Sequence, residues 1–207
     1  MNVMFISDSC GQHDALMLPW GNMIIHAGNI TRNGTRSEVV DFLQWFAHLN
    51  YQHKIFIAGT DDHFFEKEPK AVRRLIPAGV IYLEESGVEI GGLKIWGSPY
   101  NSYNHGSAFG KTEEKIVGHW EKIPDDSNML VIHSPAYGVL DKNAKGEHEG
   151  SKDLLRKLVK VEPRYFICGH RQSTHGYEYR YGIHFINASV TNDEFKITHK
   201  PVFQWYP

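Results

Sequence analysis

The sequence lacks most of the features that mark secreted, membrane-spanning and disulfide-bonded proteins. It has only two cysteines, Cys10 and Cys168, which excludes a disulfide framework and favours a reducing compartment. Its first residues, MNVMFISDSC, lack the basic region and the apolar run of a signal peptide. No stretch approaches the ~20 apolar residues that a membrane span requires. We therefore expect a cytoplasmic protein that does not cross a membrane.

A strong charge of one sign is also absent. The 22 Lys and Arg residues nearly balance the 24 Asp and Glu residues, and the formal net charge of -2 gives no footprint for nucleic acid or an anionic membrane. The sequence has no internal repeat, low-complexity segment or linker, so we expect a single domain over residues 1–207. It does not indicate an oligomeric state. The 13 histidines exceed the ordinary share and direct attention to metal sites.

Short apolar runs, each followed by a turn, alternate with helical patterns. The runs are too short and too rich in β-branched and aromatic residues for helices, and they read VMFIS, MIIHAG, KIFIAG, MLVIH and RYFICGH. The helical patterns cover residues 35–49, 67–76, 111–123 and 150–161. Residues 80–100 predict a hairpin that turns at Gly91-Gly92, and THGYEYRYGIHFINASV and FKITHKPVFQWYP repeat this pattern. The order predicts an α/β protein with mixed sheets.

Polar residues stand at the carboxyl ends of the predicted strands. They are Asp8, Asn29, the Thr60-Asp61-Asp62 run, His133 and His170. Ligands of open α/β sheets bind at that edge. For any one of these residues, a turn-forming or hydrogen-bonded structural role is the simpler interpretation. Together they predict a polar binding site along one edge of the sheets.

The order of these motifs resembles that of the calcineurin-like metallophosphoesterases, whose blocks read D-x-H, G-D, G-N-H-D/E, H and G-H-x-H. Residues 19–62 resemble most the small metallophosphoesterase-domain branch, and GSPY, HWEKIP, IHSPAYGVLD and FINAS extend the resemblance over nearly the whole chain. It implies an α/β fold of two mixed β-sheets, packed as a sandwich and flanked by helices. In that family, two metal ions bridged by an aspartate bind the phosphate and generate a hydroxide nucleophile.

Several of the family's site positions carry other residues in this sequence. Cys10 replaces a histidine, Asn29 the bridging aspartate, Thr60 an asparagine ligand, Asp61 the catalytic histidine and Gln172 the last histidine. The resemblance thus places the metal positions at Asp8, Cys10, Asn29, His133, His170 and Gln172. Without the bridging carboxylate nothing offsets the repulsion between two dications, so we expect no usual two-metal centre. The remaining alternatives are one divalent metal ion, Zn²⁺ or Mn²⁺, or none.

Two further groups of residues are candidates for binding a ligand. In the loop GSPYNSYNHGSAFG, Tyr100, Tyr103 and His105 could stack on a base to which Asn101 hydrogen-bonds, although an ordered surface loop is an equal alternative. The backbone amides after Gly28 and Gly59, with Arg32 or Arg171, could hold a phosphate group.

The sequence favours a degenerate phosphoesterase that binds a small phosphorylated ligand, such as a nucleotide, with little or no two-metal hydrolysis. The strand and turn signals are clear although the site is substituted, which indicates that the scaffold serves another purpose. Asp61 and His133 are the candidates for any remaining catalysis. The alternative is an active phosphodiesterase or phosphatase with one metal ion, or with a rebuilt site. A module for protein interaction alone has no positive feature in its favour.

Overall fold

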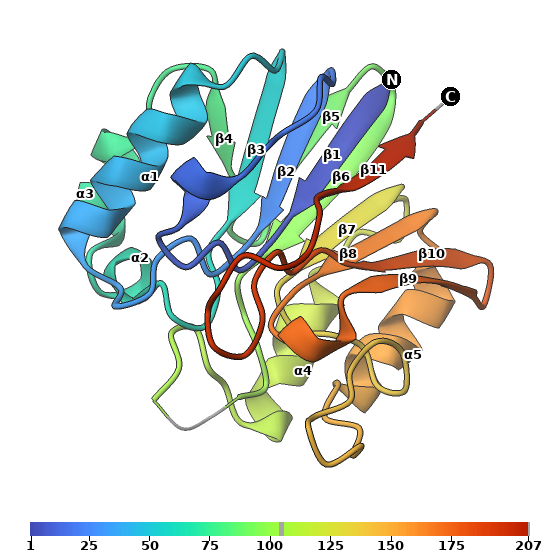
Figure 1. Ribbon diagram of the computed structural model, residues 1–207. Coiled ribbons are helices and arrows are strands. Elements are labelled where there is room, and N and C mark those ends of the chain that lie inside the picture. The colour runs from blue at the N-terminus through green and yellow to red at the C-terminus, as the bar shows by residue number, and fades with distance from the viewer. Residues whose placement is uncertain (104–105, 207) are drawn as a thin grey trace.

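The computed structural model describes residues 1–103 and 106–206, in which two β-sheets pack face to face between two layers of helices (Figure 1). The strands are β1 (Asn2–Ile6), β2 (Met23–Ala27), β3 (His53–Ile57), β4 (Val80–Tyr82), β5 (Ser86–Ile90), β6 (Leu93–Ser98), β7 (Met129–Ile132), β8 (Tyr165–Cys168), β9 (Gly176–Arg180), β10 (Ile183–Asn187) and β11 (Val202–Trp205). The helices are α1 (Arg36–His48), α2 (His63–Lys67), α3 (Pro69–Leu75), α4 (Glu113–Glu121) and α5 (Lys152–Val161), with 3-10 turns η1 (His13–Ala15) and η2 (Gln172–Thr174).

Both sheets contain parallel and antiparallel strands. The five-stranded sheet has the order β11-β1-β2-β3-β4, and only β11 runs antiparallel to its neighbour. The six-stranded sheet has the order β5-β6-β7-β8-β10-β9, with antiparallel strands β5 and β9 at its two edges. The predicted α/β sandwich of two mixed sheets is confirmed. The carboxyl ends of β1, β2, β3, β7, β8 and β10 carry the residues of the site described below.

The core has three apolar layers. Side chains from both sheets fill the central layer, which explains why the parallel strands read as continuous apolar runs rather than alternating ones. Phe42 and Phe46 of α1 pack against the outer face of the first sheet, and Trp120 of α4 and Leu158 of α5 pack against the second. Among the described residues, no helix is long and apolar enough to cross a membrane.

The structure confirms two of the three predicted hairpins. β5 and β6 pair antiparallel around Gly91-Gly92, and β9 pairs in the same way with β10. The third prediction is wrong, because FKITHKPVFQWYP contributes one strand, β11, which pairs with β1 in the other sheet. Pro201 lacks the N–H that a strand pairing would use, and β11 begins only after it.

A capping box fixes the loop that follows β2. The Thr35 hydroxyl accepts a hydrogen bond from the Glu38 backbone N–H, and the Glu38 carboxylate accepts one from the Thr35 N–H. The same carboxylate accepts hydrogen bonds from the backbone N–H groups of Arg32 and Asn33. The start of α1 therefore holds the loop that carries Asn29.

Candidate functional site at the strand ends

Asn29 connects the ends of three neighbouring strands. Its Nδ2–H group donates a hydrogen bond of 3.1 Å to Asp8 Oδ1, after β1. Its Oδ1 accepts hydrogen bonds from the Thr60 hydroxyl at 3.2 Å and from the Asp61 backbone N–H at 2.9 Å, both after β3. Asn29 is buried, so the amide is held in one orientation by partners on both sides. Sequence position alone could not show that both ends of this amide are engaged.

Asp8 connects the two sheets. Its Oδ2 accepts hydrogen bonds from the His170 backbone N–H at 2.9 Å and from the Ser189 hydroxyl at 2.7 Å. Its backbone carbonyl accepts a hydrogen bond from the Thr191 hydroxyl at 2.7 Å. Ser189 and Thr191, which the sequence reasoning missed, follow β10 at a sixth strand end. The FINAS segment, which ends at Ser189, could have indicated this strand end, but in the sequence it served only as evidence for the family resemblance.

His133 presents a free ring nitrogen inside the protein. Its Nδ1 lies 2.7 Å from the Ala27 carbonyl oxygen, which can only accept, so Nδ1 carries a proton. Nε2 is buried, has no hydrogen-bond partner among the described residues, and lies 3.9 Å from Asp8 Oδ1. An imidazole oriented by a carbonyl at one nitrogen and free at the other is the usual state of a metal-ligating histidine.

His170 lies between His133 and the loop after β6. The His170 ring stacks on Tyr103 with centroids 4.0 Å apart and lies edge-on to His133 at 5.5 Å. Its Nδ1 lies 3.4 Å from the Thr60 hydroxyl. Enclosure of the ring, together with the nearby His133, lowers the pKa of His170 to about 3. The ring is therefore neutral near pH 7, and the loop covers the site through Tyr103.

The backbone at the site adopts conformations that are rare for residues other than glycine. Asp8, Cys10, Asn29 and His170 have φ values of 55°, 46°, 55° and 67°. Such residues cluster at functional sites, because surrounding contacts must hold them there. Gly59 permits the close approach of the strands, since a Cβ atom there would lie 2.4 Å from Asn29 Oδ1.

Asp62 is a buried structural carboxylate. It accepts hydrogen bonds from the Ile30, Thr31 and Gly59 backbone N–H groups and from the Thr31 hydroxyl, at 3.2, 2.9, 2.7 and 2.6 Å. It thereby joins the loops after β2 and β3. The sequence-based hypothesis that the amides after Gly28 and Gly59 hold a phosphate is therefore wrong for the Ile30 and Thr31 N–H groups, because Asp62 already accepts from them.

Among the described residues, the polar contacts of Asp8 do not include the side chains of Arg32, Arg171 or Gln172, which have other neighbours. Arg32 is exposed, with its guanidinium 4.6 Å from the centre of the Phe195 ring. Arg171 forms an ion pair with Glu149 and lies 5.2 Å above the Tyr103 ring. Gln172 lies in η2 and lines a separate hollow with Asn143, Lys145 and Asp193. Their roles in binding stay predictions.

The loop residues predicted to contact a base are mostly engaged within the protein. Tyr100 stacks on His119, with centroids 3.8 Å apart. The buried Asn101 donates from Nδ2 to the Ala108 carbonyl at 2.8 Å and accepts at Oδ1 from the Tyr103 N–H at 3.0 Å. His105 lies outside the described residues. Asn101 therefore shapes the loop, and Tyr103 is the member that reaches the site.

The remaining predicted metal position, Cys10, is buried. Burial, and then the charge of Asp8, raise the pKa of the Cys10 thiol far above its ordinary value. Without a bound cation, Cys10 is therefore a protonated thiol. Within residues 1–103 and 106–206, no group of three or more His, Cys, Asp or Glu side chains is arranged to hold a metal ion.

Asp61 provides a test of the site's electrostatics. Burial is the main cause that raises the pKa of this carboxyl from 3.8 to about 6. A raised folded-state pKa favours the protonated form of Asp61. The stabilising contribution of the protonated carboxyl is complete below pH 3.8 and is lost as the pH rises through about 6.

In EDTA, we expect Asp61→Asn to have a higher Tm than the wild type at pH 7, with the difference vanishing towards pH 4. Thermal melts across this range, with Asp14→Asn as an exposed control, measure it; a pH-independent difference would contradict the assignment.

Comparisons with known proteins place this sandwich with polar strand ends in the class of metallophosphoesterase-domain proteins. No model of a known protein family matches the chain. The chain is 29% identical over 222 residues to human metallophosphoesterase domain-containing protein 1, covering 95% of this chain and 68% of that protein. It is 30% identical over 204 residues to the Caenorhabditis elegans UPF0046 protein C25E10.12, covering 89% of this chain and 73% of that protein. The chain belongs to this family of UPF0046 and metallophosphoesterase-domain proteins.

The solved structures add support for the fold. The protein TT1561 of Thermus thermophilus superposes with a TM-score of 0.62 at 13% identity, covering 90% of this chain and 88% of that one. At this identity, the similarity concerns the fold alone.

Proposed function

We propose that this protein binds a small phosphorylated ligand, a nucleotide being one such ligand, at the strand ends of a metallophosphoesterase scaffold that performs little or no two-metal hydrolysis. The observation that carries this proposal is the hydrogen bond from Asn29 Nδ2 to Asp8 Oδ1. Proteins of this family usually bind divalent metal ions. The question is therefore whether the side chains at the strand ends can ligate such ions.

The side chains at the strand ends do not fit two metal ions. An amide N–H cannot ligate a cation, and that of Asn29 is directed at the Asp8 oxygen that a first metal would need. The Asn29 oxygen already accepts two hydrogen bonds, and a neutral amide leaves the repulsion between two dications without compensation. These side chains therefore do not support hydrolysis by two metal ions.

The charge of the site limits how a phosphate can bind. Asp8, Asp61 and Asp62 bring carboxyl groups to the strand ends, while His170 is neutral near pH 7. A bare phosphate would be repelled by ionised carboxylates. The Thr60 hydroxyl already donates to Asn29 Oδ1, and the His133 Nδ1–H already donates to the Ala27 carbonyl. His133 Nε2 carries a lone pair that can ligate a cation, which supports binding of a phosphate group accompanied by a divalent cation.

A second candidate function is hydrolysis with a single metal ion. The free Nε2 of His133, 3.9 Å from Asp8 Oδ1, favours it. His133, Asp8 and His170 would hold the ion, which would supply a polarised water and neutralise charge on the phosphate. In that case, the chain's own part is to orient His133 through the Ala27 carbonyl and to shield the site with Tyr103.

Three measurements on the full chain test the proposed function. We expect AMP with Mn²⁺ to raise the Tm by several degrees and AMP in EDTA to raise it less, because a cation must offset the carboxylates. We expect no turnover of bis-p-nitrophenyl phosphate above background with added Mn²⁺. Metal analysis after purification completes the comparison.

The outcomes separate the two candidates. Stoichiometric metal with turnover that His133→Ala abolishes would establish the single-metal hydrolase and contradict the binder. His48→Ala, which removes an exposed histidine at the end of α1, is the matched control. A Tm that no phosphorylated compound raises, with or without Mn²⁺, would contradict both candidates.

A further inference from the structure

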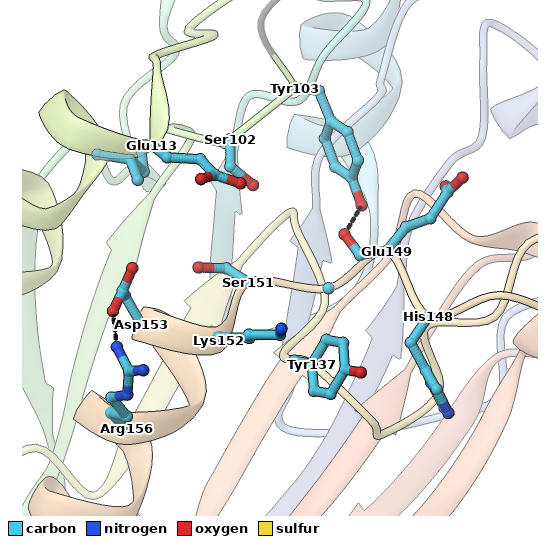
Figure 2. A pocket seen from close by; sticks show the side chains of 12 residues that line it. Ser102, Tyr103, Glu113, Tyr137, His148, Glu149, Ser151, Lys152, Asp153 and Arg156 are labelled. Atoms are coloured by element: carbon cyan, nitrogen blue, oxygen red, sulfur yellow. Dashed lines mark hydrogen bonds and ion pairs between the residues drawn. The ribbon is translucent and has the colours of Figure 1, made fainter.

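A polar hollow lies next to the strand ends and contains none of the residues assigned above to metal positions. Its volume is about 550 Å³, and its walls come from the loop after β6, from α4, from the segment that leads into α5 and from the start of α5 (Figure 2). Tyr103, whose ring stacks on His170, also lines this hollow. The Tyr103 hydroxyl donates a hydrogen bond of 3.4 Å to the backbone carbonyl of Glu149, another lining residue. Tyr103 thus contacts both the hollow and the strand-end residue His170.

A buried carboxylate orients a histidine on the lining. Asp141 is fully buried, and its Oδ1 lies 2.5 Å from Nδ1 of His148, while its Oδ2 accepts hydrogen bonds of 2.9 Å from the Gly138 and Gly150 N–H groups. The pairing places a proton on Nδ1 and fixes the ring, so Nε2 is the nitrogen left for an external partner. The His148 side chain is 34% exposed and lines both this hollow and its neighbour.

The charged groups of the hollow are largely paired with one another. Asp153 bonds with Arg156, and Glu149 with Arg171 outside the hollow. The Lys152 ammonium lies 4.9 Å from the centre of the Tyr137 ring, and Figure 2 shows the two side chains together. The lining therefore offers many hydrogen-bonding groups around aromatic rings rather than a strong charge of one sign. This character suits a group with several hydroxyls.

We propose that the hollow binds the hydroxyl-bearing, sugar-like part of the phosphorylated ligand. His148 Nε2 accepts a hydrogen bond from a ligand hydroxyl, Lys152 donates one, and Asp141 acts as the positioning residue for His148. The inference rests on the proposed function, because the phosphate of the same ligand occupies the strand ends on the other side of Tyr103. The ligand class is then a sugar phosphate or the sugar-phosphate part of a nucleotide.

Calorimetric titration of the full chain with Mn²⁺ tests the proposal, using inorganic phosphate and ribose 5-phosphate as probes. We expect ribose 5-phosphate to bind about tenfold more tightly than phosphate, because a tenfold gain in affinity corresponds to one or two additional hydrogen bonds. His148→Ala should remove that gain and leave phosphate binding unchanged. Lys152→Met, at an exposed position, should weaken only ribose 5-phosphate binding. His48→Ala, on the opposite helical layer, should change neither affinity.

The outcomes distinguish this inference from the proposed function. If phosphate binds and ribose 5-phosphate binds no more tightly, the hollow has no role and the proposed function stands. If His148→Ala and Lys152→Met weaken both probes equally, the residues act on the fold and the inference is overturned. If neither probe binds the wild type, the proposed function fails and the inference fails with it. A melting curve for each variant accompanies the titrations.

Discussion

Replacing Asp62 by alanine is expected to lower the free energy of unfolding by about 3–5 kcal/mol, because it removes the acceptor of four buried hydrogen bonds. The N–H groups of Ile30, Thr31 and Gly59 would lose their partner inside the protein. A buried donor left without an acceptor costs its full desolvation energy. For a chain of this size, the loss corresponds to a Tm lower by roughly 10 °C. Urea and thermal denaturation of the variant measure it.

The neighbouring carboxylate supplies a matched control. Asp61 is half-buried where Asp62 is fully buried, and its raised pKa means that ionisation of Asp61 costs stability at pH 7. Asp61→Ala should therefore not lower the free energy of unfolding at pH 7. The free energy of unfolding of Asp62→Asn should lie between those of the two alanine variants. The amide keeps one oxygen as an acceptor, but its NH₂ group is a donor that faces other backbone N–H donors. Equal losses for Asp61→Ala and Asp62→Ala would contradict the structural role given to Asp62.

The fold, and the meeting of the candidate site residues at one edge of the sheets, could be predicted from sequence because their signals are local. An apolar run followed by a turn identifies a strand and its carboxyl end from neighbouring residues alone. The strands before Asp8, Asn29 and His133 lie where these apolar runs predict them. Parallel pairing then brings those ends to one edge, where the hydrogen bonds of Asn29 join them. The motif order supplied the family, which the comparisons confirm.

The role of each side chain could not be predicted, because it depends on partners far away in the sequence. The resemblance gives Asp61 in GTDD the position of a catalytic histidine, but only the pairing of Asp62 with Thr31 on another loop shows that Asp62 is a structural carboxylate. Tyr100 and Tyr103 are three residues apart, yet one stacks on His119 and the other on His170. The predicted hairpin at the end of the chain failed for the same reason, since β11 joins the other sheet.

The largest change in activity is expected from restoring the family's residues. A variant with Asn29→Asp, Thr60→Asn, Asp61→His and Gln172→His should hydrolyse bis-p-nitrophenyl phosphate with Mn²⁺ at least about 100-fold faster than the wild type. Loss of a group that only supports a metal ligand commonly lowers metal affinity or activity about 10–100-fold. The four substitutions restore ligands themselves, so a larger effect on activity is expected. The backbone accommodates the key change, because aspartate tolerates the left-handed conformation of Asn29 as asparagine does.

The single variant Asn29→Asp separates metal binding from catalysis. In EDTA, it should have a lower Tm than the wild type, since a carboxylate replaces the amide that now donates to Asp8 at 3.1 Å. Mn²⁺ should raise its Tm more than that of the wild type, because the cation offsets the new repulsion. If the variant is folded and Mn²⁺ does not raise its Tm, Asn29 does not determine metal binding.

Comparison of the four-residue variant with one that retains Gln172 then tests the part played by position 172. Gln172 lines a separate hollow with Asn143 and Asp193, whereas Asn29 and Thr60 are hydrogen-bonded to each other. If both variants hydrolyse the substrate equally, position 172 lies outside the site, as its place in the separate hollow indicates, and the metal position that the family resemblance gave to Gln172 is wrong. If activity requires Gln172→His, η2 must turn towards Asp8 when metal binds. If neither is active and both are folded, substitution of these residues does not explain the absence of hydrolysis, and the proposal that the scaffold lost its chemistry through them is contradicted.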